Sequence, residues 1–87
     1  MAEKKTQEEL RVILAEAAMK VTVGARYEHY KHQTYKVMTL ALREEDNEPC
    51  VVYEPEYAKG IPFIRTVANW TEQVEVDGKK VNRFTKL

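Results

Sequence analysis

The sequence predicts a mainly β fold of the α+β class: a small β-barrel or roll of about five or six short strands, preceded by one N-terminal amphipathic helix. Three observations lead to this prediction. Apolar residues recur at helical spacing as far as Gly24 and alternate with polar residues afterwards. Proline, glycine and acidic residues break the alternating part into short segments. The length of 87 residues allows one small domain with a thin core.

The chain divides into three parts in this interpretation: a flexible N-terminus over residues 1–6, the amphipathic helix over 7–21 and the β domain over 25–87. The helix begins with a capping box, in which the Thr6 hydroxyl accepts from the amide of Glu9 while the Glu9 side chain reaches back. An isolated helix of this length is marginally stable. Its apolar stripe is therefore expected to pack on the rest of the chain, or otherwise to mediate self-association or bind a partner. The stripe consists of Leu10, Ile13, Leu14, Ala17 and Val21.

The segments after Gly24 are rich in residues that favour strands. The acidic run that ends at Pro49 indicates a turn, and Pro55 ends a strand or places it at a sheet edge. Asp77-Gly78 between two alternating runs is the strongest hairpin signal in the chain. The strands are expected at residues 26–30, 35–42, 50–53, 62–65, 70–76 and 80–84.

The charges cancel overall, with 14 Lys and Arg against 14 Asp and Glu. Residues 25–43 and 58–87 each carry a net charge of +3, whereas residues 44–57 carry −6. This balance argues against a protein that coats nucleic acid, but it leaves room for a local basic face formed by the two positive segments. The alternative is that these charges pair across neighbouring strands in solvent.

Cysteine content and hydropathy limit the kinds of covalent or metal site and the cellular location that the sequence allows. Cys50 is the single cysteine, which excludes an internal disulfide and a multi-cysteine zinc site. No apolar run of signal-peptide or membrane-spanning length is present, so a cytoplasmic protein without a membrane partner is expected. His29 and His32 have no further clustered ligands, and we predict neither a metal nor a cofactor.

No residue is assigned a catalytic role. Cys50 opens an apolar strand, where a free cysteine is normally a small buried hydrophobe, and its spacing from the histidines does not indicate a catalytic pair. Glu54 and Glu56 share a strand face but show no sign of burial, so solvated charges are expected there. The three glycines lie too far apart to form a phosphate loop.

Aromatic and basic positions after residue 24 follow a recognisable order. They are 25–31 (Ala-Arg-Tyr-Glu-His-Tyr-Lys), 35–37 (Tyr-Lys-Val), 51–53 (Val-Val-Tyr), Tyr57, 63–65 (Phe-Ile-Arg), Trp70 and 75–84, which holds Val-Asp-Gly-Lys and closes with Arg-Phe. Over about residues 25–84 the chain resembles the bacterial domain of unknown function 1653. The resemblance implies a small β-roll of SH3-like barrel type and no established activity. This sequence differs from the family pattern in three places: it adds the helix at 7–21, its glycine lies at Gly24 instead of position 25, and Phe63-Ile64 replaces Trp-Val.

Binding is the more plausible role, because so small a core cannot bury every tyrosine hydroxyl without a partner. Arg65 is the sharpest candidate: it lies in an otherwise apolar strand, and a planar guanidinium suits a carboxylate or phosphate. The alternatives are core packing for the aromatic residues and an ion pair with Glu72 or Glu75 for Arg65. The candidate ligand-binding residues are His29, Tyr30, Lys31, Tyr35, Tyr53, Tyr57, Arg65 and Trp70.

Two classes of function follow from these residues. The leading one is a small non-catalytic binding module whose aromatic-basic face recognises a peptide, a nucleic-acid segment or a small anionic ligand. The alternative is an enzyme or enzyme accessory that acts on an anionic metabolite through His29 and Arg65. A fold that brings His29, Tyr35 and Arg65 together favours the alternative.

Overall fold

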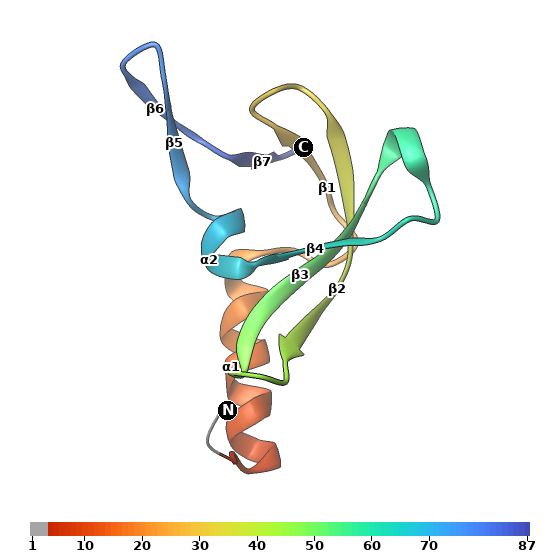
Figure 1. Cartoon of the computed structure of the whole chain (residues 1–87), viewed down its shortest axis with the longest axis vertical. Coiled ribbons are helices and arrows are strands. Elements are labelled where there is room, and N and C mark those ends of the chain that lie inside the picture. Colours follow the sequence, from red (N-terminus) through yellow and green to blue (C-terminus); the bar gives the residue numbers. More distant parts are fainter. Residues whose placement is uncertain (1–3) are drawn as a thin grey trace.

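The computed structural model describes residues 4–87 and contains one N-terminal helix and seven strands in two sheets (Figure 1). The larger sheet has the order β4-β3-β2-β1-β7, and all its neighbours are antiparallel. Strands β5 and β6 form a separate two-stranded sheet. The elements are α1 (Gln7–Lys20), β1 (Arg26–His29), β2 (Thr34–Arg43), β3 (Glu48–Pro55), the 3₁₀ turn η1 (Glu56–Ala58), β4 (Phe63–Thr66), α2 (Val67–Trp70), β5 (Gln73–Val76), β6 (Lys79–Asn82) and β7 (Phe84–Lys86).

Helix α1 begins at its capping box as the sequence predicts. The Thr6 hydroxyl accepts from the Glu9 amide at 3.1 Å, and the Glu9 carboxylate accepts from the Thr6 amide at 2.9 Å. The helix ends at Lys20, one residue earlier than predicted, because Val21 adopts an extended conformation while its amide still bonds to the Ala17 carbonyl. Val21 thereby turns its side chain into the core, where it is 1% exposed.

The larger sheet carries the core on one face, whereas the smaller β5–β6 sheet lies apart from it. The inner face of the larger sheet carries Val37, Val51 and Tyr53, and helix α1 packs against β2 and β3. The β5–β6 hairpin projects away from the main sheet (Figure 1). The core consists of Ala17, Val21, Tyr27, Val37, Val51, Tyr53, Val67, Trp70 and Phe84.

The Asp-Gly hairpin is confirmed. Asp77 and Gly78 both adopt positive φ angles, of 51° and 76°, as the tightest hairpin turns require. Their strands pair with Val74 opposite Val81.

The mainly β class with one N-terminal helix is confirmed, but the sheet stays open and does not close into a barrel. Strands β4 and β7 form the two edges, and the segment between them first forms α2 and the β5–β6 hairpin. This segment takes the chain from the edge strand β4 to β7, which pairs with β1 at the other edge of the sheet. Nothing in the described residues bridges the two edges by strand pairing.

The strand boundaries also differ from the predicted ones: β3 begins at Glu48, so Pro49 lies within a strand and not at the end of a turn, and the segments predicted at 70–76 and 80–84 are divided differently. The strand predicted from residue 70 is preceded by a short helical turn, α2, which Thr66 caps by accepting from the Asn69 amide at 3.1 Å. The segment predicted at 80–84 is divided at Arg83 between β6 and β7, which pair with different partners. The division at Arg83 raises the number of strands from the six predicted segments to seven.

The predicted stripe of α1 lies partly in the core. Ala17 is 3% exposed, while Leu10, Ile13 and Leu14 are half-buried. The division into residues 1–6, 7–21 and 25–87 stays a prediction, and residues 1–3 lie outside the described part. No helix between residues 4 and 87 is long and apolar enough to cross a membrane.

Candidate functional site

Aromatic rings from five elements meet on the inner face of the main sheet. Phe84 of β7 stacks on Trp70 of α2, with ring centroids 3.6 Å apart and planes at 4°. Tyr53 of β3 packs edge-on against Trp70 at 5.0 Å and against Tyr35 of β2 at 5.4 Å. His29 of β1 approaches Phe84 at 5.0 Å. Four of the predicted site residues, His29, Tyr35, Tyr53 and Trp70, therefore gather around Phe84.

Trp70 occupies a core position in this cluster. Its side chain is 2% exposed, and the rings of Tyr27, Tyr53 and Phe84 surround it. Its indole Nε1 has no hydrogen-bond partner among the described residues.

Arg65 of β4 has only uncharged partners. Its Nε donates to the Tyr53 hydroxyl at 2.9 Å and its Nη1 donates to the Asn69 side-chain oxygen at 2.7 Å. Its guanidinium carbon lies 5.2 Å from the centroid of the Phe84 ring, a cation–π contact. Among residues 4–87 no carboxylate lies within 4.0 Å of this guanidinium, so the ion pair with Glu72 or Glu75 is not formed.

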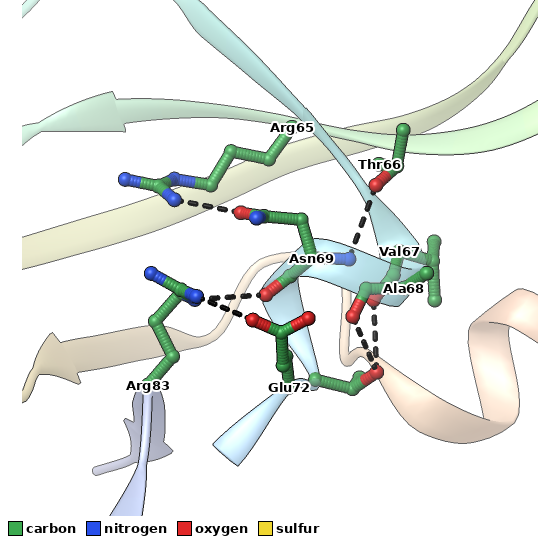
Figure 2. Close-up of polar contacts among 8 residues, drawn as sticks. Arg65, Thr66, Val67, Ala68, Asn69, Glu72 and Arg83 are labelled. Atoms are coloured by element: carbon green, nitrogen blue, oxygen red, sulfur yellow. Dashed lines mark hydrogen bonds and ion pairs between the residues drawn. The ribbon is translucent and has the colours of Figure 1, made fainter. Parts of the chain in front are cut away.

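Glu72 instead pairs with Arg83, a residue that is not among the candidates predicted from the sequence. Arg83 Nη2 lies 2.7 Å from the Glu72 carboxylate, and its Nε donates to the Asn69 carbonyl at 3.1 Å. Arg65 and Arg83 therefore bracket Asn69, one bound to its side chain and the other to its backbone. Figure 2 shows both guanidinium groups extending to the same side of the α2 turn.

The α2 turn is fixed at both ends, which orients Asn69. Thr66 caps its start, and the Thr71 hydroxyl donates to the Val67 carbonyl at 2.9 Å near its end (Figure 2). A threonine three residues ahead of the asparagine is the local signal that could have predicted this turn. Four residues give too short a pattern for helical periodicity to register.

His29 is 8% exposed, and its Nδ1 accepts from the Lys31 amide at 3.2 Å. Burial lowers the pKa of this imidazole, and the positive charges of Arg65, Arg83 and Lys31 lower the pKa further, in that order. The ring is therefore neutral at neutral pH. Its surroundings carry a positive potential to which three separate side chains contribute.

The remaining predicted residues lie at the rim. Tyr30 and Lys31 belong to the turn after β1, where the Lys31 ammonium lies 5.8 Å from the Tyr30 ring centroid. Tyr57 of η1 is 71% exposed, with its ring centroid 6.5 Å from that of Tyr35. Burial, followed by the neighbouring Tyr57 and Tyr53, raises the pKa of Tyr35, so its phenol stays protonated at neutral pH.

A cleft of about 190 Å³ is lined by Tyr27, Trp70 and Phe84 of the aromatic cluster, and two others open beside these elements. One of about 250 Å³ lies between the β5–β6 hairpin and the turn after β1, and His29 and Tyr30 line it together with Val76 and Val81. The other, of about 350 Å³, contains the Arg26–Glu56 ion pair and lies away from the aromatic cluster. Within residues 4–87 no three His, Cys, Asp or Glu side chains come together as a metal site requires.

Fold and site together define a small α+β domain with an open antiparallel sheet, whose inner face carries an aromatic cluster bordered by two arginines. The chain belongs to the family described as Protein of unknown function (DUF1653), which matches residues 25–86. This confirms the resemblance noted in the sequence and places α1 ahead of the matched segment.

A solved structure agrees with this assignment. The chain is similar to the crystal structure of a DUF1653 protein from Bordetella bronchiseptica, with 30% sequence identity and a TM-score of 0.68. The similarity covers 80% of this chain and 92% of that one. A comparison with curated proteins finds no match.

Proposed function

We propose that this chain is a small non-catalytic binding module that holds a small anionic ligand at Arg65 and Arg83. The observation that carries the proposal is the set of partners of Arg65: a tyrosine hydroxyl, an amide oxygen and an aromatic ring, with no carboxylate among the described residues. A partly buried cation without a counterion is costly, and a bound anion would compensate its charge.

The local charge balance supports the same conclusion. Arg83 is matched by Glu72, which leaves the charge of Arg65 in excess, and Lys31 adds to it from the turn after β1. The lowered pKa of His29 has these cations among its causes, which indicates that their fields converge on one region.

A small ligand is favoured over a long polyanion. The chain is neutral overall, and residues 44–57 carry a net charge of −6, so an extended nucleic acid would meet repulsion beyond the two arginines. We also propose a cytoplasmic location, in keeping with the free and buried thiol of Cys50.

The test is an NMR titration with inorganic phosphate and acetate. We expect chemical-shift changes at Arg65, Asn69 and Arg83, and an affinity at least about tenfold weaker for Arg65→Gln, because a lost charge-assisted hydrogen bond typically weakens binding by this much or more. Arg43→Gln is the matched control, since Arg43 is an exposed arginine paired with Asp46 in the turn between β2 and β3. Equal binding by wild type and Arg65→Gln, or shifts confined to other regions, would contradict the proposal.

One observation keeps the enzymatic alternative as a second candidate. His29, Tyr35 and Arg65 lie around the same cluster, with the His29 and Tyr35 ring centroids 6.4 Å apart and Arg65 influencing the pKa of both. An enzyme acting on an anionic metabolite would use the neutral imidazole as a donor through Nε2, because Nδ1 accepts from the Lys31 amide. Turnover of a phosphate ester, followed by ³¹P NMR, that disappears in His29→Gln while phosphate binding persists would support it. Equal, background-level hydrolysis in both proteins would count against it.

A further inference from the structure

We infer that the ligand of this site is a phosphomonoester attached to a planar ring, of the nucleotide type. Its phosphate lies against Arg65, Asn69 and Arg83, and its ring lies on the exposed face of Phe63. This inference rests on the proposed function and names the chemical class of the anion.

The donor geometry favours a phosphate over a carboxylate. Arg65 uses Nε and Nη1 in its protein contacts, and Arg83 uses Nε and Nη2, so one terminal nitrogen of each guanidinium bonds to nothing in residues 4–87. Asn69 accepts through its side-chain oxygen, which leaves its amide nitrogen as a third donor. Three donor groups on one side of a single turn match the three terminal oxygens of a phosphomonoester better than the two of a carboxylate.

An aromatic row passes beside this donor set. It consists of four rings in sequence, Tyr57, Tyr35, Tyr53 and Phe63, whose neighbouring centroids lie 6.5, 5.4 and 6.2 Å apart. The two middle rings are buried or half-buried, whereas Tyr57 is 71% and Phe63 44% exposed. Arg65 touches this row through its hydrogen bond to the Tyr53 hydroxyl.

Phe63 has the position that a ring attached to the phosphate requires. It lies two residues before Arg65 on strand β4, so both side chains project from the inner face, about 6–7 Å apart along the strand. That spacing suits a planar ring joined to a phosphate through a sugar-sized spacer. A large apolar ring left 44% exposed beside an uncompensated cation offers stacking and charge recognition together.

The acidic charge of residues 44–57 and the short length of β4 argue for a single nucleotide instead of a strand. A polynucleotide would need a basic track for its successive phosphates. The charged groups beside the donor set are Arg65, Arg83 and Lys31, with Glu72 opposing them.

The experiment compares three probes by NMR or calorimetry: inorganic phosphate, adenosine and adenosine 5′-monophosphate. We expect the monophosphate to bind at least about tenfold more tightly than phosphate, since stacking of one base contributes this much or more. Phe63→Leu, which keeps apolar bulk without the ring, should reduce the affinity for the monophosphate to that for phosphate and leave phosphate binding unchanged. Ile64→Leu is the matched control, because Ile64 is 60% exposed on the opposite face of the same strand and should change neither affinity.

The outcomes separate this inference from the proposed function. Arg65-dependent binding of phosphate with no gain for the monophosphate overturns the ring assignment and leaves the anion site standing. If Phe63→Leu weakens phosphate binding as much as it weakens monophosphate binding, the ring assignment is also overturned. Phe63 would then support the fold of the site without contacting the ring of the ligand. A thymidine oligonucleotide that binds more tightly than the monophosphate overturns the assignment to a small ligand. Absence of any Arg65-dependent binding removes both proposals.

Discussion

Among single residues, His29 couples the site to pH. Its imidazole is buried, accepts a hydrogen bond at Nδ1 and faces Arg65, Arg83 and Lys31. Each of these features favours the neutral ring over the imidazolium. The burial, the hydrogen bond and the nearby cations are all absent in the unfolded chain, so protonation of His29 favours unfolding.

We therefore expect acidification to destabilise the protein in the range below the ordinary pKa of histidine. The pKa of His29 is lowered in the folded state, so the unfolded state binds more protons there. The contribution of His29 is complete above the ordinary histidine pKa and is lost as the pH falls through the lowered one. Urea unfolding at pH 7.5 and pH 5.5 should show this loss in wild type and a smaller loss in His29→Gln. His32→Asn is the control: His32 is exposed, its φ of 79° suits asparagine, and the loss should match wild type.

A second prediction tests whether Arg65 and a bound anion change the electrostatic field at His29. Because the Arg65 charge is the largest electrostatic cause of the lowered pKa after burial, Arg65→Gln should raise the pKa of His29 toward its ordinary value. Saturation of the site with phosphate should raise it in the same direction. The ring-proton shifts of His29 as a function of pH measure both effects. An unchanged His29 titration in Arg65→Gln would show that the two side chains do not share one field, and Arg43→Gln should leave it unchanged.

At the scale of elements, local chemistry fixes the ends of α1 while tertiary packing fixes its position. Thr6 and Glu9 satisfy each other's backbone amides, and this hydrogen bonding lowers the pKa of the Glu9 carboxyl. Thr6→Ala should therefore lower the free energy of unfolding by about 1 kcal/mol. Thr6→Ser keeps the accepting oxygen and should stay within about 0.5 kcal/mol of wild type in urea unfolding followed by circular dichroism. Equal stability of Thr6→Ala and Thr6→Ser would contradict the role of the cap.

The elements that the sequence predicts correctly are those defined by neighbouring residues. The capping box sets the start of α1, and Asp77-Gly78 sets the β5–β6 turn, because each depends on a few consecutive backbone angles. Helix α2 was missed because four residues show no periodicity. The open sheet was missed because closure depends on the path between β4 and β7, which no local pattern encodes.

The same difference between local and long-range signals explains which residues of the candidate site could be predicted. Arg65 could be selected because a charge in an apolar strand stands out in the sequence. Its partners, Tyr53 and Asn69, come from another strand and from the unpredicted turn α2. Arg83 could not be selected, because its contact with Asn69 joins residues 14 apart through a bend between two strands.

At the scale of the whole molecule, α1 belongs to the same core as the sheet although it lies ahead of the family's matched segment. Its contribution comes chiefly from Ala17, which is 3% exposed and packs in the cluster that includes Trp70 and Phe84. A domain of this size has a thin core, so a small number of buried contacts from α1 forms a large share of its stability.

Two adjacent alanines of α1 test this integration. Ala17 is buried and Ala18 is exposed, so the substitutions Ala17→Glu and Ala18→Glu change helix propensity and net charge equally. Ala17→Glu places an unpaired carboxylate in the core and should lower the free energy of unfolding by about 3 kcal/mol or more, which a domain of this size barely survives. Ala18→Glu should stay within about 0.5 kcal/mol of wild type. Thermal and urea unfolding monitored by tryptophan fluorescence measure the difference, because Trp70 is the single tryptophan and lies in the sheet's core. If the two variants have the same stability, the sheet and α2 form a stable core without α1. If only Ala17→Glu is destabilised, the helix and the sheet fold as one unit.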